Sequence, residues 1–314
     1  MVGVIAHIAN PTVGENVELA EAAEAAEATW IGLADAFWWR DVWLQLAVVA
    51  GATSRIEIGP AMTNPYLRHP FHTASAVATL QELAPGRTFV GIAAGGSEVT
   101  AAAGTGRADA PERVAELVSL LDRCSRGEPL DPRSGRTLDL ALRRVPVLVA
   151  GRGDRMLRVA GAVADRVLLW AIPASDLDRT VSMVTDAAAE RERAPELIWA
   201  PLVDHGSVTE RSLMQVAVYA SLNTRPAIRA RWGLAGRQVE RIRERLVAGD
   251  TAAAAALVPR DAFDDLLLTD NSPARVAGRA RLLGVSSMAV PGHSAGSLAG
   301  HVEWAREVEK HLDR

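Results

Sequence analysis

Short apolar runs alternate with longer amphipathic segments over most of the chain, and this alternation predicts strands that alternate with helices. Residues 56–97 show one complete unit. An apolar run ends at Pro65, helical spacing returns over residues 72–83, and a second apolar run covers 88–93. Strands are predicted in this way at eight places: 2–9, 30–34, around 56–58, 88–93, 145–150, 166–170, 196–203 and 285–290.

The segments between these strands have the apolar spacing of helices. The alternation lapses after the seventh strand, where residues 211–268 are mostly helical in pattern, and the Pro, Gly and Asp residues of 126–144 predict a surface loop. The other helices are predicted at 14–28, 41–51, 72–83, 111–124, 156–164, 175–193, 272–283 and 297–312.

Eight β/α units with continuous apolar strands predict a parallel sheet covered by helices, and eight is the number at which such a sheet closes. We therefore expect an α/β fold, a TIM (β/α)8 barrel formed by one domain over residues 1–314. A helical insertion is expected after the seventh strand, at about 206–270. A doubly wound open sheet is the alternative, and it is disfavoured because no GxGxxG motif follows the first strand.

The composition narrows the class of protein. Hydrophobic residues make up 49% and charged residues 23% of the 314 residues, so the chain can bury a large core. The formal net charge of -4, with acids and bases mixed, gives no electrostatic reason to expect nucleic acid or a membrane as partner. The N-terminus lacks a basic leader with a cleavage site, and the single Cys124 excludes an internal disulfide. We expect a cytoplasmic protein.

In a TIM barrel the reactive residues lie where the strands end, and two of these ends are rich in glycine. The second of them runs into a helix whose free amides and positive dipole end favour an anion, and an arginine there can add a charged contact. The two ends therefore predict a phosphate site, although glycines can also serve only to turn the chain. They consist of Gly95, Gly96 and Ser97 and of Gly151, Arg152 and Gly153.

Two further strand ends carry polar side chains. Thr63 and Asn64, beside Met62, can pair with the edge of a flat heterocycle, or they can form an ordinary turn before Pro65. Asp35 ends the second predicted strand, where it can cap the next helix or accept a hydrogen bond from a ligand. We favour the ligand for Asp35 and leave both interpretations of 62–64 open.

Several longer motifs occur in the order typical of a known family. They are AAEAAEATWIGLAD, TNPYLRHP, ATLQELAPGRTFVGIAAGGS, VPVLVAGRGDRMLRVAGAVADRVLLW and, near the end, SPARVAGRARLLGV. On these motifs the chain resembles the luciferase-like monooxygenase superfamily. TNPYLRHP and AGGS most resemble the branch that uses the deazaflavin coenzyme F420, which includes the methylenetetrahydromethanopterin reductases. Members that use FMN share the barrel and much of the pattern.

The resemblance implies where a cofactor lies. A flavin-like ring is expected over the strand ends, supported by a bulge of the third strand that often contains a non-proline cis peptide bond; Met62 to Asn64 match this bulge. Asp35 matches the family's acid after the second strand, but this chain has Ala36 where many F420-dependent members have histidine. The phosphate contacts carry over to Gly95, Gly96, Ser97, Gly151, Arg152 and Gly153.

The reaction implied by the resemblance is hydride transfer between carbon 5 of F420 and a small organic or natural-product substrate, with the protein acting as a reductase. His7, at the end of the first strand, is our first choice for the acid–base group, because histidine titrates near neutral pH. A purely structural role is the alternative for this histidine. The substrate pocket is expected among Trp38, Trp39, Trp170, His205 and His293, although Trp38 and Trp39 equally suit a subunit interface.

Three functions remain open on the sequence alone. An F420-dependent oxidoreductase is the first, an FMN-dependent luciferase-like monooxygenase is the second, and a non-catalytic barrel that acts as a binding protein is the third. Ala36 keeps the third one open, because it removes the usual proton donor. We expect a small-molecule substrate and a homodimer, and neither a metal site nor a nucleic-acid or membrane partner.

The predicted insertion contains an arginine-rich run, RPAIRARWGLAGRQVERIRERL. Such a run indicates a solvated helical face. The alternative is that it contacts an anionic substrate or the acidic polyglutamate tail of F420.

Overall fold

The computed structural model describes residues 1–6, 11–96, 100, 103–106, 108–203, 210–268 and 270–312, without the side chains of 210–212. One eight-stranded sheet has the order β3-β2-β1-β10-β7-β6-β5-β4, and its ladders are parallel. All eight predicted strands are present in it. They are β1 Val2–Ala6, β2 Trp30–Leu33, β3 Glu57–Pro60, β4 Val90–Ala93, β5 Val147–Ala150, β6 Arg166–Trp170, β7 Glu196–Ala200 and β10 Ser287–Gly292.

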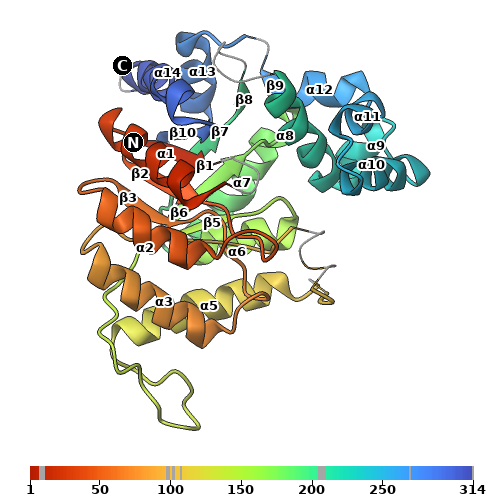
Figure 1. The fold of residues 1–314 in the computed structure, drawn as a ribbon. Coiled ribbons are helices and arrows are strands. Elements are labelled where there is room, and N and C mark those ends of the chain that lie inside the picture. Colours follow the sequence, from red (N-terminus) through yellow and green to blue (C-terminus); the bar gives the residue numbers. More distant parts are fainter. Residues whose placement is uncertain are drawn as a thin grey trace.

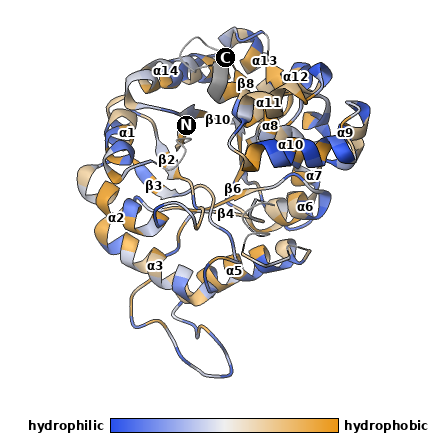
Figure 2. Cartoon of the chain, turned by 45° about the vertical axis from the view of Figure 1, so that its right-hand side comes forward, coloured by the Kyte–Doolittle hydropathy of each residue, from blue (hydrophilic) through white to orange (hydrophobic). Residues whose placement is uncertain are grey.

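The two end strands of this order, β3 and β4, close the sheet. Parallel bridges join Ile58 to Thr88 and Thr63 to Ile92. The amide of Thr63 donates to the carbonyl of Gly91 over 2.9 Å, and the amide of Ala93 donates to the carbonyl of Thr63 over 2.9 Å. The strands therefore form the TIM barrel that the sequence predicts, and Figure 2 shows the helices in a ring around it.

The barrel helices begin at recognisable caps. Thr12 and Glu15 form a capping box at the start of α1, and Asp41 accepts hydrogen bonds from the amides of Trp43 and Leu44 at the start of α2. The predicted helices agree with the observed ones to within a few residues. These are α1 Val13–Ala25, α2 Val42–Ala52, α3 Pro70–Leu83, α5 Ala110–Ser125, α6 Asp154–Val163, α7 Ala174–Ala189, α13 Pro273–Leu282 and α14 Ala295–Leu312.

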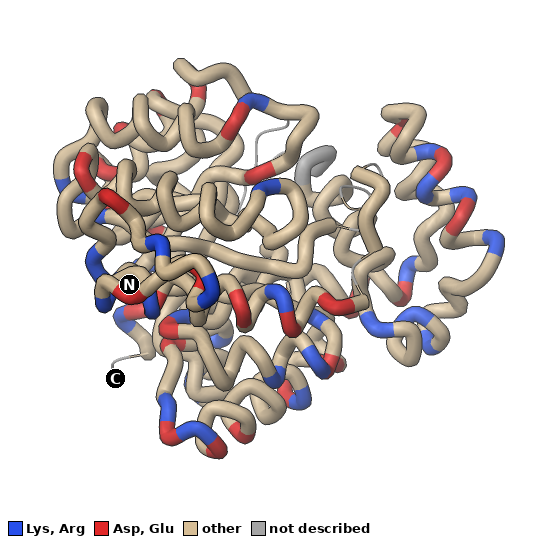
Figure 3. The backbone as a smooth tube through the Cα atoms, turned by 90° about the horizontal axis from the view of Figure 1, so that it is seen from below, with Lys and Arg blue, Asp and Glu red and all other residues tan. Residues whose placement is uncertain are grey.

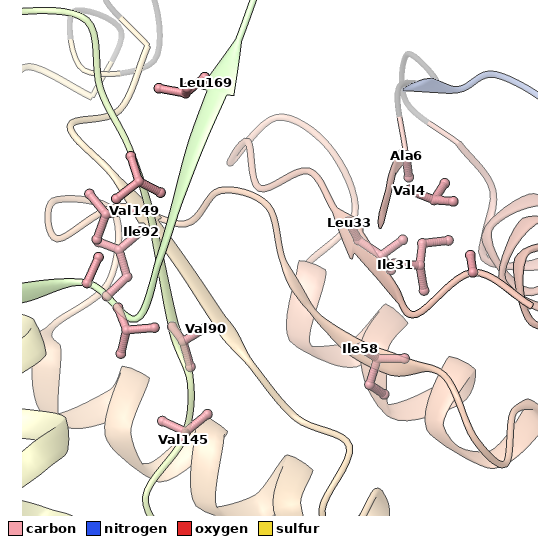
Figure 4. Close-up of a cluster of buried hydrophobic side chains, with 14 of the residues drawn as sticks. Val4, Ala6, Ile31, Leu33, Ile58, Val90, Ile92, Val145, Val149 and Leu169 are labelled. Carbon is pink, nitrogen blue, oxygen red and sulfur yellow. The ribbon is translucent and has the colours of Figure 1, made fainter. Parts of the chain in front are cut away.

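Alternate side chains of the strands fill two separate cores. One set, which includes Val4, Ile31 and Ile58, packs in the core between strands and helices (Figure 4). The other set fills the barrel interior, where the rings of Trp30 and Phe89 meet edge to face with centroids 5.5 Å apart. Glycines make room for these rings: a Cβ at Gly3 would lie 2.0 Å from the Trp30 ring. The interior is therefore closed below the strand ends.

Residues 202–203 and 210–268 project beside the barrel and have an apolar core of their own (Figure 1). The sequence predicts one strand over 196–203, but β7 ends at Ala200, because Pro201 has no amide to continue the ladder. Figure 1 labels this region as β8 Leu202–Val203, α8 Glu210–Asn223, α9 Pro226–Arg231, α10 Arg237–Val247, α11 Thr251–Ala256, α12 Arg260–Leu266 and β9 Leu267–Leu268, with β8 and β9 paired in parallel.

Within the described residues, no helix has the length and apolar character needed to cross a bilayer.

Candidate functional site

A cavity of about 990 Å³ lies at the carboxyl ends of the barrel strands. We call it the strand-end cavity. Its barrel side is built by residues at or just after five successive strands: Ala6, Asp35, Met62, Gly95 and Gly151. Its other side is formed by helices α8, α9 and α10 and the turn between α8 and α9, which contribute Tyr219, Asn223, Arg225, Arg229 and Arg243 among others.

The barrel side of the cavity is apolar and made partly of small side chains. Ile5, Ala61, Met62, Leu168 and Trp170 all line it. The peptide bond between Ala61 and Met62 is cis, and it lies at the third-strand bulge. Since alanines leave the surface flat between the larger side chains, this wall suits a planar ring.

Asp35 is held at the cavity by a hydrogen bond from the neighbouring strand end. The buried hydroxyl of Thr63 donates to Oδ2 of Asp35 over 2.6 Å. Burial raises the pKa of the Asp35 carboxyl, and the bond from Thr63 partly opposes this rise. Helix α2 is capped by Asp41, so the capping interpretation of Asp35 is wrong. Among the described residues, none donates to Oδ1 of Asp35, which leaves that atom for a ligand.

Asn64 combines the two roles that the sequence leaves open. Its Oδ1 accepts hydrogen bonds of 3.1 Å from the amides of Tyr66 and Leu67, which is ordinary turn chemistry. The buried side chain also lines the strand-end cavity. Its carbonyl oxygen is thus engaged in the turn, whereas its amide nitrogen can still donate.

Arg152 gives the cavity a positive charge that no described carboxylate neutralises. Its guanidinium donates to the carbonyls of Trp170 and Ala171, over 2.9 and 2.8 Å. Burial lowers its pKa to about 10, so the group stays charged at neutral pH. A half-buried cation that contacts only carbonyl dipoles is poorly compensated, and an anion in the cavity would stabilise it.

Helix α6 begins beside this arginine without a side-chain cap. Its first amides are therefore available to a ligand, and the helix dipole favours a negative one. Asp154, in the first turn, opposes an anion, but it is paired with Arg179. Backbone and side chain together make this end of the cavity suitable for a phosphate.

The structure brings most of the predicted site residues to one place. His7, Ser97 and His205 lie outside the described residues. Thr63 takes part through its bond to Asp35. The sequence-predicted residues that line the strand-end cavity are Asp35, Met62, Asn64, Gly95, Gly96, Gly151, Arg152, Gly153 and Trp170.

Three predicted substrate-pocket residues do not line this cavity. Trp38 is 46% exposed and meets Phe37 edge to face at 4.9 Å. Trp39 closes a turn in which its amide donates to the carbonyl of Ala36 over 2.8 Å. The ring of His293 lies 6.4 Å from that of His301. These three residues thus lie outside the lining of the strand-end cavity, and their part in binding a substrate stays a prediction.

The side chains of α8 to α10 are the part of the site that sequence reasoning did not assign. The arginine-rich run of the sequence contains three of these side chains, Arg225, Arg229 and Arg243, and is the only sequence feature that indicates them. Helical spacing alone does not say which of its arginines face the barrel, because that depends on how the insertion packs.

Comparison with known proteins connects this geometry to one family. The family model described as luciferase-like monooxygenase matches residues 2–290. The 5,10-methylenetetrahydromethanopterin reductase of Archaeoglobus fulgidus is 27% identical over 230 residues, which are 69% of each chain.

Two solved structures share the fold across nearly the whole chain. The coenzyme F420-dependent tetrahydromethanopterin reductase of Methanopyrus kandleri superposes with a TM-score of 0.79, at 20% identity, over 99% of both chains. An F420-dependent secondary alcohol dehydrogenase superposes with a TM-score of 0.74, at 17% identity, over 98% of both chains. At these identities the two structures establish the barrel.

Proposed function

The chain belongs to the luciferase-like monooxygenase family, and we propose that it is an F420-dependent oxidoreductase that reduces a small organic or natural-product substrate. The reductase of Archaeoglobus fulgidus supports this proposal, as do the motifs TNPYLRHP and AGGS. The observation that carries it is the position of Arg152: a half-buried cation that no described carboxylate neutralises, beside the uncapped start of α6 and at one end of an apolar wall.

The residues of the strand-end cavity fit the two chemically different parts of this cofactor. The wall of Ala61, Met62 and Leu168 suits the planar deazaflavin ring, and Asp35 and Asn64 can hydrogen-bond to its polar edge. Gly151 and Gly153 let the backbone approach a phosphate, while Arg152 supplies the charge. The cavity volume of about 990 Å³ leaves room for a substrate.

When bound, F420 supplies or accepts a hydride at carbon 5. The residues of this chain position it and its substrate, and the insertion helices reduce access of water from the far side. The acid–base group stays a prediction: His7 follows Ala6, which lines the cavity, whereas Ala36 removes the histidine that many F420-dependent members have.

An FMN-dependent monooxygenase is the second candidate, because the family description includes this reaction class and because an isoalloxazine ring also suits the cavity wall. Titration of the purified protein with F420 and with FMN, followed by fluorescence, separates the two. We expect F420 to bind at least about tenfold more tightly than FMN, a difference of about 1.4 kcal/mol. Binding of FMN alone, with substrate-coupled oxygen consumption, would replace the proposal by the monooxygenase. Binding of neither would support the non-catalytic barrel.

We further propose that the protein forms a homodimer through helix α2. Leu44 is 72% exposed and Val48 is 50% exposed, and both lie on this helix. Phe37 and Trp38, which precede the helix, are 50% and 46% exposed. Four large apolar side chains in one short segment form a surface that a second copy can cover.

A further inference from the structure

We propose that the insertion side of the strand-end cavity holds a second anion site, formed by Arg229 and Arg243, which binds the polyglutamate tail of F420. This inference rests on the proposed function and extends it from the ring and phosphate to the tail. Arg229 comes from α9 and Arg243 from α10, and both line the cavity that Arg152 also lines. The insertion lies at the right of Figure 3, where basic segments alternate with acidic ones.

Arg229 is in an unfavourable electrostatic environment. The side chain is half-buried, and one guanidinium nitrogen donates to the carbonyl of Leu222 over 2.8 Å. Burial lowers the pKa of Arg229, and the positive charge of Arg243 lowers it further. The two cations are thus close enough to repel each other, and part of one is withdrawn from water.

Neither cation is neutralised by a described carboxylate. Glu240 and Glu244 are on α10 with Arg243, but neither forms an ion pair within 4.0 Å with Arg229 or Arg243. Other arginines of the same cavity differ in this respect. Arg225 makes two hydrogen bonds to the buried carboxylate of Asp176, one of 3.0 Å and one of 2.5 Å.

The uncompensated arginines of the cavity come from two opposite sides. Arg152 lies at the end of β5 on the barrel, and Arg229 and Arg243 lie on the insertion. An anion bound at Arg152 leaves the second pair unsatisfied, so a ligand that satisfies both sites carries negative charge at two separate points. F420 has this distribution, since a chain of glutamates continues beyond its phosphate. An anionic substrate has the same carboxylate or phosphate chemistry, and the experiment must separate the two sources.

The test compares F420 that carries no glutamates with F420 that carries several, using fluorescence titration at low ionic strength. We expect the wild-type protein to bind the long-tailed form about fivefold more tightly, from two partly exposed ion pairs. The double variant Arg229→Gln/Arg243→Gln should bind both forms equally, with unchanged affinity for the tail-less form. The wild-type preference should also fall as salt is added, because the contacts are partly exposed.

Two further variants serve as controls: one for the loss of a positive charge, and one for a folding defect in the double variant. Arg241→Gln removes a charge from an exposed position of the same helix, outside the cavity lining, and should keep the preference for the long tail. Arg243→Gln alone changes only an exposed side chain, and it should lose part of the preference even if loss of the Arg229 bond to Leu222 disturbs folding.

Three results would overturn the inference, and they are distinguishable. Equal wild-type affinity for both forms would overturn the tail assignment and leave the arginines to an anionic substrate. A tail preference that persists in the double variant would place the tail elsewhere. Failure of even the tail-less form to bind the wild-type protein would instead overturn the proposed function itself.

Discussion

Thr63 donates its hydroxyl to Asp35 over 2.6 Å and thereby ties the end of β3 to the end of β2 at the edge of the strand-end cavity. Thr63 is fully buried, and its backbone also bridges to β4. The residue therefore serves both barrel closure and the position of the acidic side chain, which explains why a small β-branched hydroxyl residue suits this place.

Replacing Thr63 by valine should expose how much this bond contributes. Thr63→Val keeps the shape but leaves a partly buried carboxyl without its donor, so we expect the free energy of unfolding at neutral pH to fall by about 1 to 3 kcal/mol. Urea denaturation measures this change. Thr63→Ser retains the hydroxyl and should lose less. An equal loss in both variants would mean that the methyl packing, and not the hydrogen bond, stabilises the site.

Asp35→Asn should change the pH dependence of stability. Burial raises the pKa of Asp35 in the folded state above its ordinary value of 3.8, so the folded protein holds this proton more tightly than the unfolded chain does. Wild-type stability is therefore lost as pH rises from about 3.8 through the folded pKa. Asparagine does not titrate, so the stability of the variant relative to wild type should increase over this interval and stay level above it.

Urea denaturation of the wild-type and Asp35→Asn proteins at a series of pH values gives this difference directly. A difference that does not depend on pH would show that the Asp35 carboxyl titrates in the folded protein as it does in the unfolded chain.

Arg152→Gln should weaken binding of F420 through its phosphate. Loss of one charge-assisted contact costs about 1.5 to 3 kcal/mol, which corresponds to at least about tenfold in the dissociation constant. The deazaflavin lacking the phosphate should bind wild type and variant alike. Arg158→Gln, at an exposed position of α6, the helix that begins two residues after Arg152, should leave both affinities unchanged. A loss that is equal for the two ligands would indicate that Arg152 acts on the ring or on folding.

The fold can be predicted from the sequence because the patterns that mark each strand and helix lie within a few consecutive residues. Each strand is a short apolar run ended by Pro, Gly or a polar residue, and eight such runs leave few topologies open. Local signals fail at Pro201. The apolar pattern continues through this proline to Val203, but β7 ends at Ala200 because Pro201 has no amide hydrogen. Leu202 and Val203 form β8 instead, which pairs with β9. That pairing joins residues far apart in sequence, which periodicity does not indicate.

The site was accessible only where it is built from consecutive residues. The glycine-rich ends predicted at 95–97 and 151–153 both reach the cavity, through residues 95–96 and 151–153, and their contact with a phosphate stays a prediction. Whether a single arginine is paired with a carboxylate cannot be predicted in the same way, because the carboxylate lies far away in the sequence. Arg225 and Arg229 are neighbours in one run, yet Arg225 meets a carboxylate 49 residues away while Arg229 meets a carbonyl. Spacing within the run does not distinguish them.

Two helical glycines should respond oppositely to alanine. In α6, a Cβ on Gly161 would lie 2.2 Å from the carbonyl oxygen of Val184 in α7, so Gly161→Ala should force the helices apart and cost about 1 to 3 kcal/mol. In α13, a Cβ on Gly278 meets nothing within 4 Å, so Gly278→Ala should stabilise by about 0.5 to 1 kcal/mol. Thermal or urea unfolding of both variants provides the comparison, and a shift of the same sign in both would contradict it.

The proposed homodimer can be tested at Leu44. A charge at this position should be unfavourable only when a second copy covers the exposed face of α2, because a side chain that is 72% exposed has little packing to lose in the monomer. We expect the wild-type protein to sediment as a dimer and Leu44→Glu to sediment as a monomer with an unchanged unfolding midpoint.

Leu282→Glu is the matched control for this surface. Leu282 is 84% exposed and lies on α13, so the same change of charge and size there should leave the dimer intact. A dimer that dissociates in Leu282→Glu but persists in Leu44→Glu would move the interface from α2 to α13. A wild-type protein that remains monomeric at every concentration would remove the dimer altogether and leave Leu44, Val48 and the preceding aromatic residues as exposed apolar surface.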